Sequence, residues 1–128
     1  MPIFLVMLGG ALGSGLRYLA GVAGQRLLGT GFPAGTLFVN VSGGLLMGLL
    51  AALLARAAGG IAAAEPMRLL LGVGVLGGYT TFSSFTLETV TMIERGQPAL
   101  ALFYVLASAL GAILALMLGL ALGRSLAA

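Results

Sequence analysis

The amino-acid composition is that of a membrane protein. Of its 128 residues, 60% are hydrophobic and only 7% are charged, and the mean hydropathy is +1.18, whereas soluble domains are typically about 25% charged. The chain has no Cys and no His, which argues against disulfides and against zinc or iron chemistry. The net charge of +3 comes from six Arg and three acidic residues scattered along the chain. No basic patch is present, so we do not expect a nucleic-acid partner.

Four apolar stretches are long enough to cross a bilayer, whose core needs about 20 helical residues per crossing. They cover residues 3–24, 37–55, 68–93 and 99–122, and they are separated by short connectors at 29–33, 56–66 and 94–98. We therefore expect an all-α membrane protein, with one four-helix transmembrane domain over residues 1–128. It should be a multi-pass protein of the cell (inner) membrane, surrounded by lipid. The 22 glycines predict close helix packing.

The arginines are balanced between the two membrane faces. An even number of spans places both termini and the second connector on one face. Each face carries three arginines: Arg56, Arg68 and Arg124 on the first, and Arg17, Arg26 and Arg95 on the second. Orientation follows mainly from the Lys/Arg difference between the faces. The count leaves two possibilities open, a true dual topology or a single orientation with a weak bias.

The third span contains a polar block in its middle, the sequence GGYTTFSSFT at residues 77–86. A block this dense in glycine and hydroxyl groups favours a helix that breaks in mid-membrane and resumes near Thr81. Unpaired backbone in lipid costs several kcal/mol per group, so a break requires protein, water or an ion to satisfy the freed groups. The alternative is an unbroken helix whose Ser and Thr side chains bond neighbouring helices.

Polar and aromatic side chains at helical spacing could line a narrow path through the spans. Spacings of three or four align Phe82 with Phe85, Thr81 with Ser84 and Glu88, and Tyr104 with Ser108. Asn40 lies inside the second span, where a buried amide needs partners. Each of these residues also has an ordinary interpretation: phenylalanines pack in apolar cores, Ser108 is small, and Asn40 could bond another helix.

Arg17 and Glu88 are the charged residues set well inside the spans. A charge at the bilayer centre costs about 2.5–3.5 kcal/mol on insertion scales. Both side chains are near enough to a span end to reach headgroup water, and Glu88 could instead be a vestibule residue or a proton carrier. The chain lacks the Ser–His or Cys–His sets of hydrolases and any phosphate-binding glycine motif. We expect no enzyme activity.

Three motifs, in order along the chain, resemble the Fluc (CrcB) family of fluoride channels. The block GGYTTFSSF at 77–85 followed by Glu88 resembles the family signature, GGALGSGLRY at 9–18 resembles its first helix, and GTLFVNVSGG at 35–44 resembles the opening of its second helix. The resemblance implies a fluoride-selective channel that exports cytoplasmic fluoride and so reduces fluoride toxicity. It further implies an antiparallel, dual-topology homodimer with a structural sodium ion at its centre.

The resemblance also implies roles for particular residues. It assigns the fluoride pathway to Asn40, Phe82, Phe85, Thr81, Ser84, Tyr104 and Ser108. It places Arg17 and Glu88 near pore entrances, and it makes the main-chain carbonyls of Gly77 and Thr80 ligands of the sodium ion. Amide and hydroxyl donors and the electropositive edges of aromatic rings suit a small, tightly hydrated anion.

One part of the fourth span departs from the family pattern. Relatives often continue the row of hydroxyl groups there, whereas this chain has Ala112 and Leu116. An interpretation from another class is a small four-helix, proton-coupled exporter of cationic drugs, but such a protein needs an embedded carboxylate that the first two spans lack. A third interpretation, a holin-like assembly protein, gives the broken span no purpose.

Overall fold

The computed structural model describes residues 2–56 and 60–127, and in these ranges the chain forms helices and turns without strands. In chain order the elements are α1 (Pro2–Leu28), α2 (Ala34–Ala55), α3 (Gly60–Met67), the π-helical segment η1 (Arg68–Leu76), α4 (Gly77–Tyr79), α5 (Ser83–Glu94) and α6 (Pro98–Ala127). Residues 57–59, which belong to the predicted second connector, lie outside the described residues.

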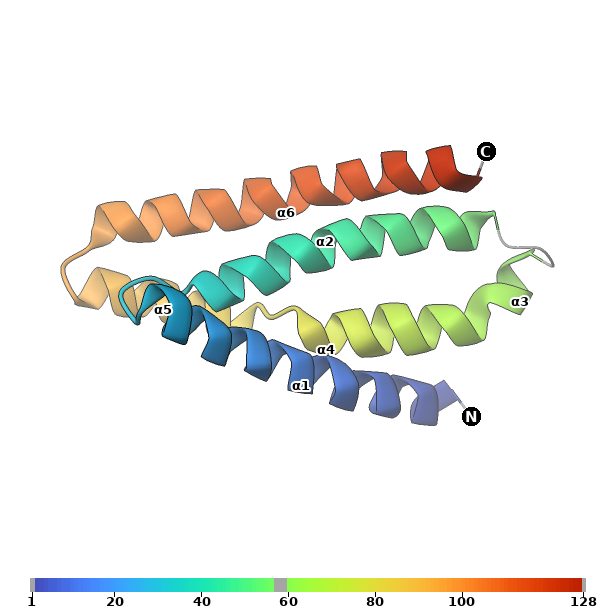
Figure 1. The fold of residues 1–128 in the computed structure, drawn as a ribbon, viewed down its shortest axis with the longest axis horizontal. Coiled ribbons are helices and arrows are strands. Elements are labelled where there is room, and N and C mark those ends of the chain that lie inside the picture. Colours follow the sequence, from blue (N-terminus) through green and yellow to red (C-terminus); the bar gives the residue numbers. More distant parts are fainter. Residues whose placement is uncertain (1, 57–59, 128) are drawn as a thin grey trace.

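Within residues 2–56 and 60–127, four helices are long and apolar enough to cross a membrane: Pro2–Leu28, Ala34–Ala55, Ala64–Glu94 and Pro98–Leu126. The predicted all-α fold with four spans and a broken third span is confirmed. Across the molecule, the order of the spans is α6, α2, the third span and α1 (Figure 1). The start of α1, the end of α2 and the end of α6 all lie at the same end of the molecule. Many large apolar side chains point outward, including Leu19 and Leu114, as lipid-facing helices require.

Glycines allow several helix pairs to touch backbone to backbone. α1 packs on η1 and α4, and a Cβ built on Gly78 would lie 2.6 Å from the carbonyl oxygen of Gly10. α2 packs on α6 in the same way, since a Cβ on Gly44 would lie 2.7 Å from the carbonyl oxygen of Ala112. Approaches this close need residues without side chains. The predicted tight packing is confirmed.

Helix ends follow from local chemistry. α1 and α5 are followed by Gly29 and Gly96, whose φ angles of 78° and 77° lie in the left-handed region that glycine adopts without strain. α6 begins at Pro98, whose missing N–H is no loss in the first turn of a helix. All four helices extend a few residues beyond, or begin a few residues before, the apolar stretches that predicted them.

Two predicted details are wrong. The helix of the third span resumes at Ser83, not at Thr81, because the backbone of Thr81 is bonded to a side chain of α2. The second connector is shorter than expected, since residues Gly60–Met67 are helical. Their alanine-rich sequence has high helix propensity, which prevails despite Pro66. The wider π-helical turns of η1 follow directly after this proline.

Candidate ion pathway at the broken third helix

The break in the third span lies between α4 and α5. On each side of it, a threonine hydroxyl group forms a hydrogen bond with a backbone group of the adjoining helix. Thr80 is extended, with φ −84° and ψ 160°. Its N–H and its Oγ1 both donate to the carbonyl oxygen of Leu76, each at 3.0 Å. On the other side, Oγ1 of Thr81 accepts the N–H of Ser84 at 3.2 Å. Thr81 therefore caps the start of α5 and leaves its own hydroxyl hydrogen for another acceptor.

Asn40 of α2 binds the break through both polar atoms of its amide. Its Oδ1 accepts the N–H of Thr81 at 2.8 Å, and its Nδ2 donates to the carbonyl oxygen of the same residue at 3.0 Å. These are backbone groups that a continuous helix would have paired internally. A primary amide carries two N–H donors, so Nδ2 keeps one hydrogen for a further acceptor.

A cavity of about 330 Å³ extends from the break to α6 and brings together six of the site residues predicted from the sequence. It is lined by Asn40, Thr80, Thr81, Phe82, Phe85, Ser108, Ala109 and Ala112. Ser108 is buried, and within the described residues its hydroxyl has no hydrogen-bond partner. A buried hydroxyl without a partner is costly, so Ser108 is free to bind something polar in this cavity. The row of hydroxyls ends at Ala112.

Phe82 and Phe85 form an aromatic pair, with ring centroids 5.8 Å apart and planes tilted by 50°. The two rings have different surroundings. Phe85 packs against Tyr104 at a centroid distance of 5.1 Å, whereas the side chain of Phe82 is 76% exposed. Core packing therefore fits Phe85 but does not fit Phe82 within a single chain.

A second, more polar cavity of about 300 Å³ lies between α1, α2 and α5, and Arg17, Ser84 and Glu88 are among the residues that line it. Glu88 joins three helices there. Its carboxylate accepts a hydrogen bond from the hydroxyl of Thr36 at 3.0 Å and another from the hydroxyl of Tyr104 at 3.1 Å. Tyr104 is fully buried, so this network holds α2 and α6 against α5.

Arg17 reaches the backbone beside the break. Its Nε donates to the carbonyl oxygen of Gly78 at 3.0 Å, and the residue is half-buried. Side chains of a helix lean toward its N-terminus, so Arg17 reaches back along α1 to the place where α1 and α4 touch. This contact favours a role for Arg17 at the break over an extension outward to headgroup water.

The two carbonyls predicted to bind sodium belong to this same break. Gly77 is exposed, and in the described part of the chain no hydrogen-bond donor is paired with the carbonyl oxygen of Gly77 or of Thr80. The neighbouring carbonyls of Gly78 and Thr81 are already bonded to side chains. At the break, the carbonyls of Gly78 and Thr81 are therefore hydrogen-bonded within the chain, whereas those of Gly77 and Thr80 are available to another partner.

Sequence reasoning missed three contacts near the break. Thr36 bonds Glu88, although its spacing of four from Asn40 could have shown that both lie on one face of α2. The hydroxyls of Ser42 and Tyr79 lie 2.9 Å apart, and no local pattern indicated that pair. Phe32, in the loop before α2, meets Tyr104 edge to face at 5.5 Å.

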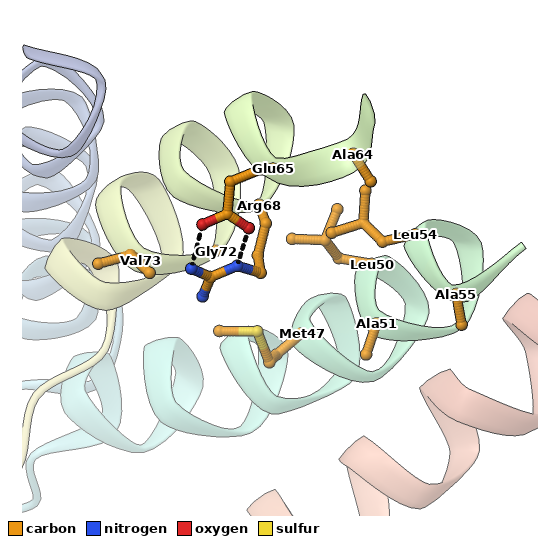
Figure 2. A pocket seen from close by; sticks show the side chains of 10 residues that line it. All are labelled: Met47, Leu50, Ala51, Leu54, Ala55, Ala64, Glu65, Arg68, Gly72 and Val73. Carbon is orange, nitrogen blue, oxygen red and sulfur yellow. Dashed lines mark hydrogen bonds and ion pairs between the residues drawn. The ribbon is translucent and has the colours of Figure 1, made fainter. Parts of the chain in front are cut away.

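A larger cavity of about 420 Å³ lies away from these residues, between α2 and the α3–η1 segment (Figure 2). Its walls are mostly aliphatic, with Met47 and Leu50 on the α2 side. Across from them, Arg68 makes two hydrogen bonds to the carboxylate of Glu65, at 2.8 and 2.7 Å. Both side chains are about half exposed, so water screens the pair and it contributes little to stability. No residue predicted from the sequence to carry function lines this cavity.

Comparisons with known proteins agree with the motifs. The family described as CrcB-like protein, Camphor Resistance (CrcB), matches residues 4–120, a region that contains the break and every candidate residue. Proteins named fluoride-specific ion channel FluC are similar along nearly the whole chain: 54% identical in Agrobacterium fabrum and 52% in Chelativorans sp., each over 97% of both chains, and 52% in Sphingopyxis alaskensis over 98% of both. With its four membrane-spanning helices and this match, the chain is a multi-pass membrane protein that belongs to the CrcB-like, or Fluc, family.

Proposed function

We propose that this chain forms a fluoride-specific ion channel that lets fluoride leave the cytoplasm and so reduces its toxicity. One observation carries the proposal: 54% identity, over 97% of both chains, to a protein named fluoride-specific ion channel. The relatives are bacterial, and in bacteria the corresponding membrane is the inner membrane. Passage through a channel forms and breaks no covalent bond, so no enzyme activity is part of the proposal.

The cavity beside the break supports an anion pathway. Fluoride is small and tightly hydrated, so a pore that removes its water must offer close hydrogen-bond donors. The free amide hydrogen of Asn40, the unpartnered hydroxyl of Ser108 and the ring edges of Phe82 and Phe85 meet at one cavity. Thr81 and Ser84 line the polar cavity on the other side of α5. Together these groups form the pathway that we propose.

The charged and hydroxyl groups of the polar cavity fit its entrance. Arg17 supplies a positive charge and Glu88 a negative one, and the carboxylate of Glu88 is held by the hydroxyls of Thr36 and Tyr104. A drug exporter driven by protons would need its carboxylate open to substrate in a binding chamber. The names of the relatives also support a channel over an exporter.

A structural sodium ion fits the break. Carbonyl oxygens freed at the end of a half-helix coordinate monovalent cations in membrane proteins, and the carbonyls of Gly77 and Thr80 lack a donor in the described part of the chain. No carboxylate lies among the residues of the break, which favours a monovalent ion over a divalent one. Two carbonyls make only part of a coordination shell, so we propose that a second copy of the chain supplies the rest.

We propose that the second copy inserts in the opposite orientation, which gives an antiparallel homodimer. The equal number of arginines on the two faces supports dual insertion. The exposed ring of Phe82 and the exposed backbone of Gly77 support the dimer, because both belong to the break and both are uncovered in one chain.

Adding one arginine to either face should push the chain toward a single orientation. We expect a C-terminal tag on the parent to be labelled from both sides of the membrane. Gln97→Arg and Ser125→Arg add charge to opposite faces, so each variant alone should be labelled mainly from one side and should lose fluoride export. Co-expression of the two variants should restore it. Labelling of the parent from one side only would contradict dual topology.

The proposed function is tested in cells by growth of a fluoride-sensitive bacterium in medium that contains fluoride. Expression of the chain should restore growth and lower intracellular fluoride, because a channel lets fluoride run down its gradient. A matched strain that expresses the protein with both Phe82 and Phe85 changed to Ile should remain sensitive. Equal growth with and without the parent chain, at verified expression, would contradict the proposal.

A further inference from the structure

The carbonyl oxygens at the break are divided into two groups by side chains from α1 and α2. Nε of Arg17 donates to Gly78, and Nδ2 of Asn40 donates to Thr81, each at 3.0 Å. In the described residues, the carbonyls of Gly77 and Thr80 have no such donor. Each of these two free carbonyls is therefore followed directly by a bonded one. The carbonyl of Tyr79, between Gly78 and Thr80, also has no donor in the described residues.

Arg17 is well placed to fix this arrangement. One turn before it on α1 lies Gly13, where a Cβ would lie 2.8 Å from the backbone nitrogen of Tyr79. The backbones of α1 and α4 are thus in contact at the point from which Arg17 reaches Gly78. The Arg17 bond holds the planar peptide between Gly78 and Tyr79, and the plane that carries the Gly77 carbonyl shares its orientation through the helical geometry of α4. The plane that carries the Thr80 carbonyl is held separately, because its N–H, that of Thr81, donates to Asn40.

We infer that Arg17 is a positioning residue for the cation site at the break: by holding the carbonyl of Gly78, it directs the adjoining carbonyl of Gly77 toward the ion. The inference rests on the proposed function, and it gives Arg17 a role distinct from attracting fluoride at a pore entrance. An entrance role depends on the positive charge. A positioning role depends on an N–H donor at the place of Nε.

Two substitutions separate the donor from the charge. In Arg17→Gln, the amide nitrogen stands four bonds from Cα, as Nε of arginine does, so the donor is kept and the charge is lost. In Arg17→Lys, the charge is kept, but a methylene group occupies that place. Arg17→Met removes both. Arg26→Gln is the matched control, since Arg26 lies in the last turn of the same helix. Arg17→Gln, Arg17→Met and Arg26→Gln are each combined with Gln97→Arg, which keeps three arginines on that face and so preserves dual insertion.

The experiment measures the sodium dependence of two properties of the purified full chain. The first is the thermal unfolding midpoint in detergent, titrated with sodium against a large organic cation. The second is fluoride efflux from vesicles over the same sodium range. The unfolding midpoint reports on sodium binding even in a variant that does not conduct.

We expect the parent, Arg17→Gln and Arg26→Gln to share one half-saturating sodium concentration, within about threefold. Arg17→Lys and Arg17→Met should need at least about tenfold more sodium. Normal sodium dependence in Arg17→Lys together with its loss in Arg17→Gln would overturn the inference in favour of a charge role. Unchanged dependence in all three Arg17 variants would also overturn it.

The failure of the inference can be told apart from the failure of the proposed function. A parent that conducts no fluoride contradicts the proposed function, whatever its sodium dependence. A parent that conducts fluoride but shows no sodium dependence in either measurement overturns both the cation site and the role of Arg17 in it, while the channel function stands.

Discussion

Phe82→Ile and Phe85→Ile should leave the protein folded, while fluoride efflux falls at least about a hundredfold in at least one of them. The swap roughly conserves apolar volume, so it should cost less than about 1.5 kcal/mol of stability. It removes, however, the electropositive ring edge that we propose contacts fluoride. A loss of about 3 kcal/mol at the barrier slows passage more than a hundredfold.

The measurement compares efflux per folded protein, with size exclusion used to verify that each variant elutes like the parent. Phe4→Ile is a suitable control, because Phe4 is an exposed residue near the start of α1 and the same chemical change there should leave the flux unaltered. Of the pair, Phe82 is the more informative, since its exposed ring has no packing role in one chain. Near-normal flux in both variants would return both residues to a packing role and leave Asn40 and Ser108 as the donors.

Gly48→Ala should destabilise the fold strongly, although alanine is the better helix former. A Cβ on Gly48 would lie 2.9 Å from the backbone nitrogen of Leu120 and closer still to the carbonyl oxygen of Leu116. Backbone atoms of α6 cannot move aside singly, so α2 and α6 must separate. We expect a loss of about 1–3 kcal/mol, the usual range for overpacking, seen as a lower thermal unfolding midpoint in detergent.

Gly15→Ala provides the control for that experiment. Apart from its chain neighbours and the nearby backbone of its own helix, no atom of the described residues lies within 4 Å of a Cβ built at Gly15, so the substitution adds a methyl group without a collision. Its only effect should be the helix-propensity gain of about 0.5–1 kcal/mol. An unfolding midpoint lowered equally in both variants would show that α2–α6 contact is not the cause.

The sequence was sufficient for the fold because each span is longer and more apolar than a soluble helix, and because the block at 77–86 interrupts only the third. The break was predicted from glycine and hydroxyl content, but its end was misplaced by two residues. That error has a physical origin. The backbone of Thr81 is bonded by Asn40, which lies 41 positions away, and no local pattern indicates which peptide a distant amide will bind.

The same limit applies to the candidate site. Spacing predicted which residues share a helix face, and the cavity at the break does bring Asn40, Phe82, Phe85 and Ser108 together. Spacing did not predict the direction of Arg17, because that depends on how closely two glycine-lined backbones approach. It also missed Thr36, because the predicted second span began at residue 37 whereas α2 begins at Ala34.

The most direct test of the proposed function is efflux from vesicles that contain only the purified chain and lipid. Vesicles are loaded with fluoride or with chloride, a potassium ionophore balances the charge, and ion-selective electrodes follow the release of each anion. We expect rapid fluoride efflux and chloride efflux no faster than from vesicles without protein. Fluoride release at the rate of protein-free vesicles, or chloride release as fast as that of fluoride, would contradict a fluoride-specific channel.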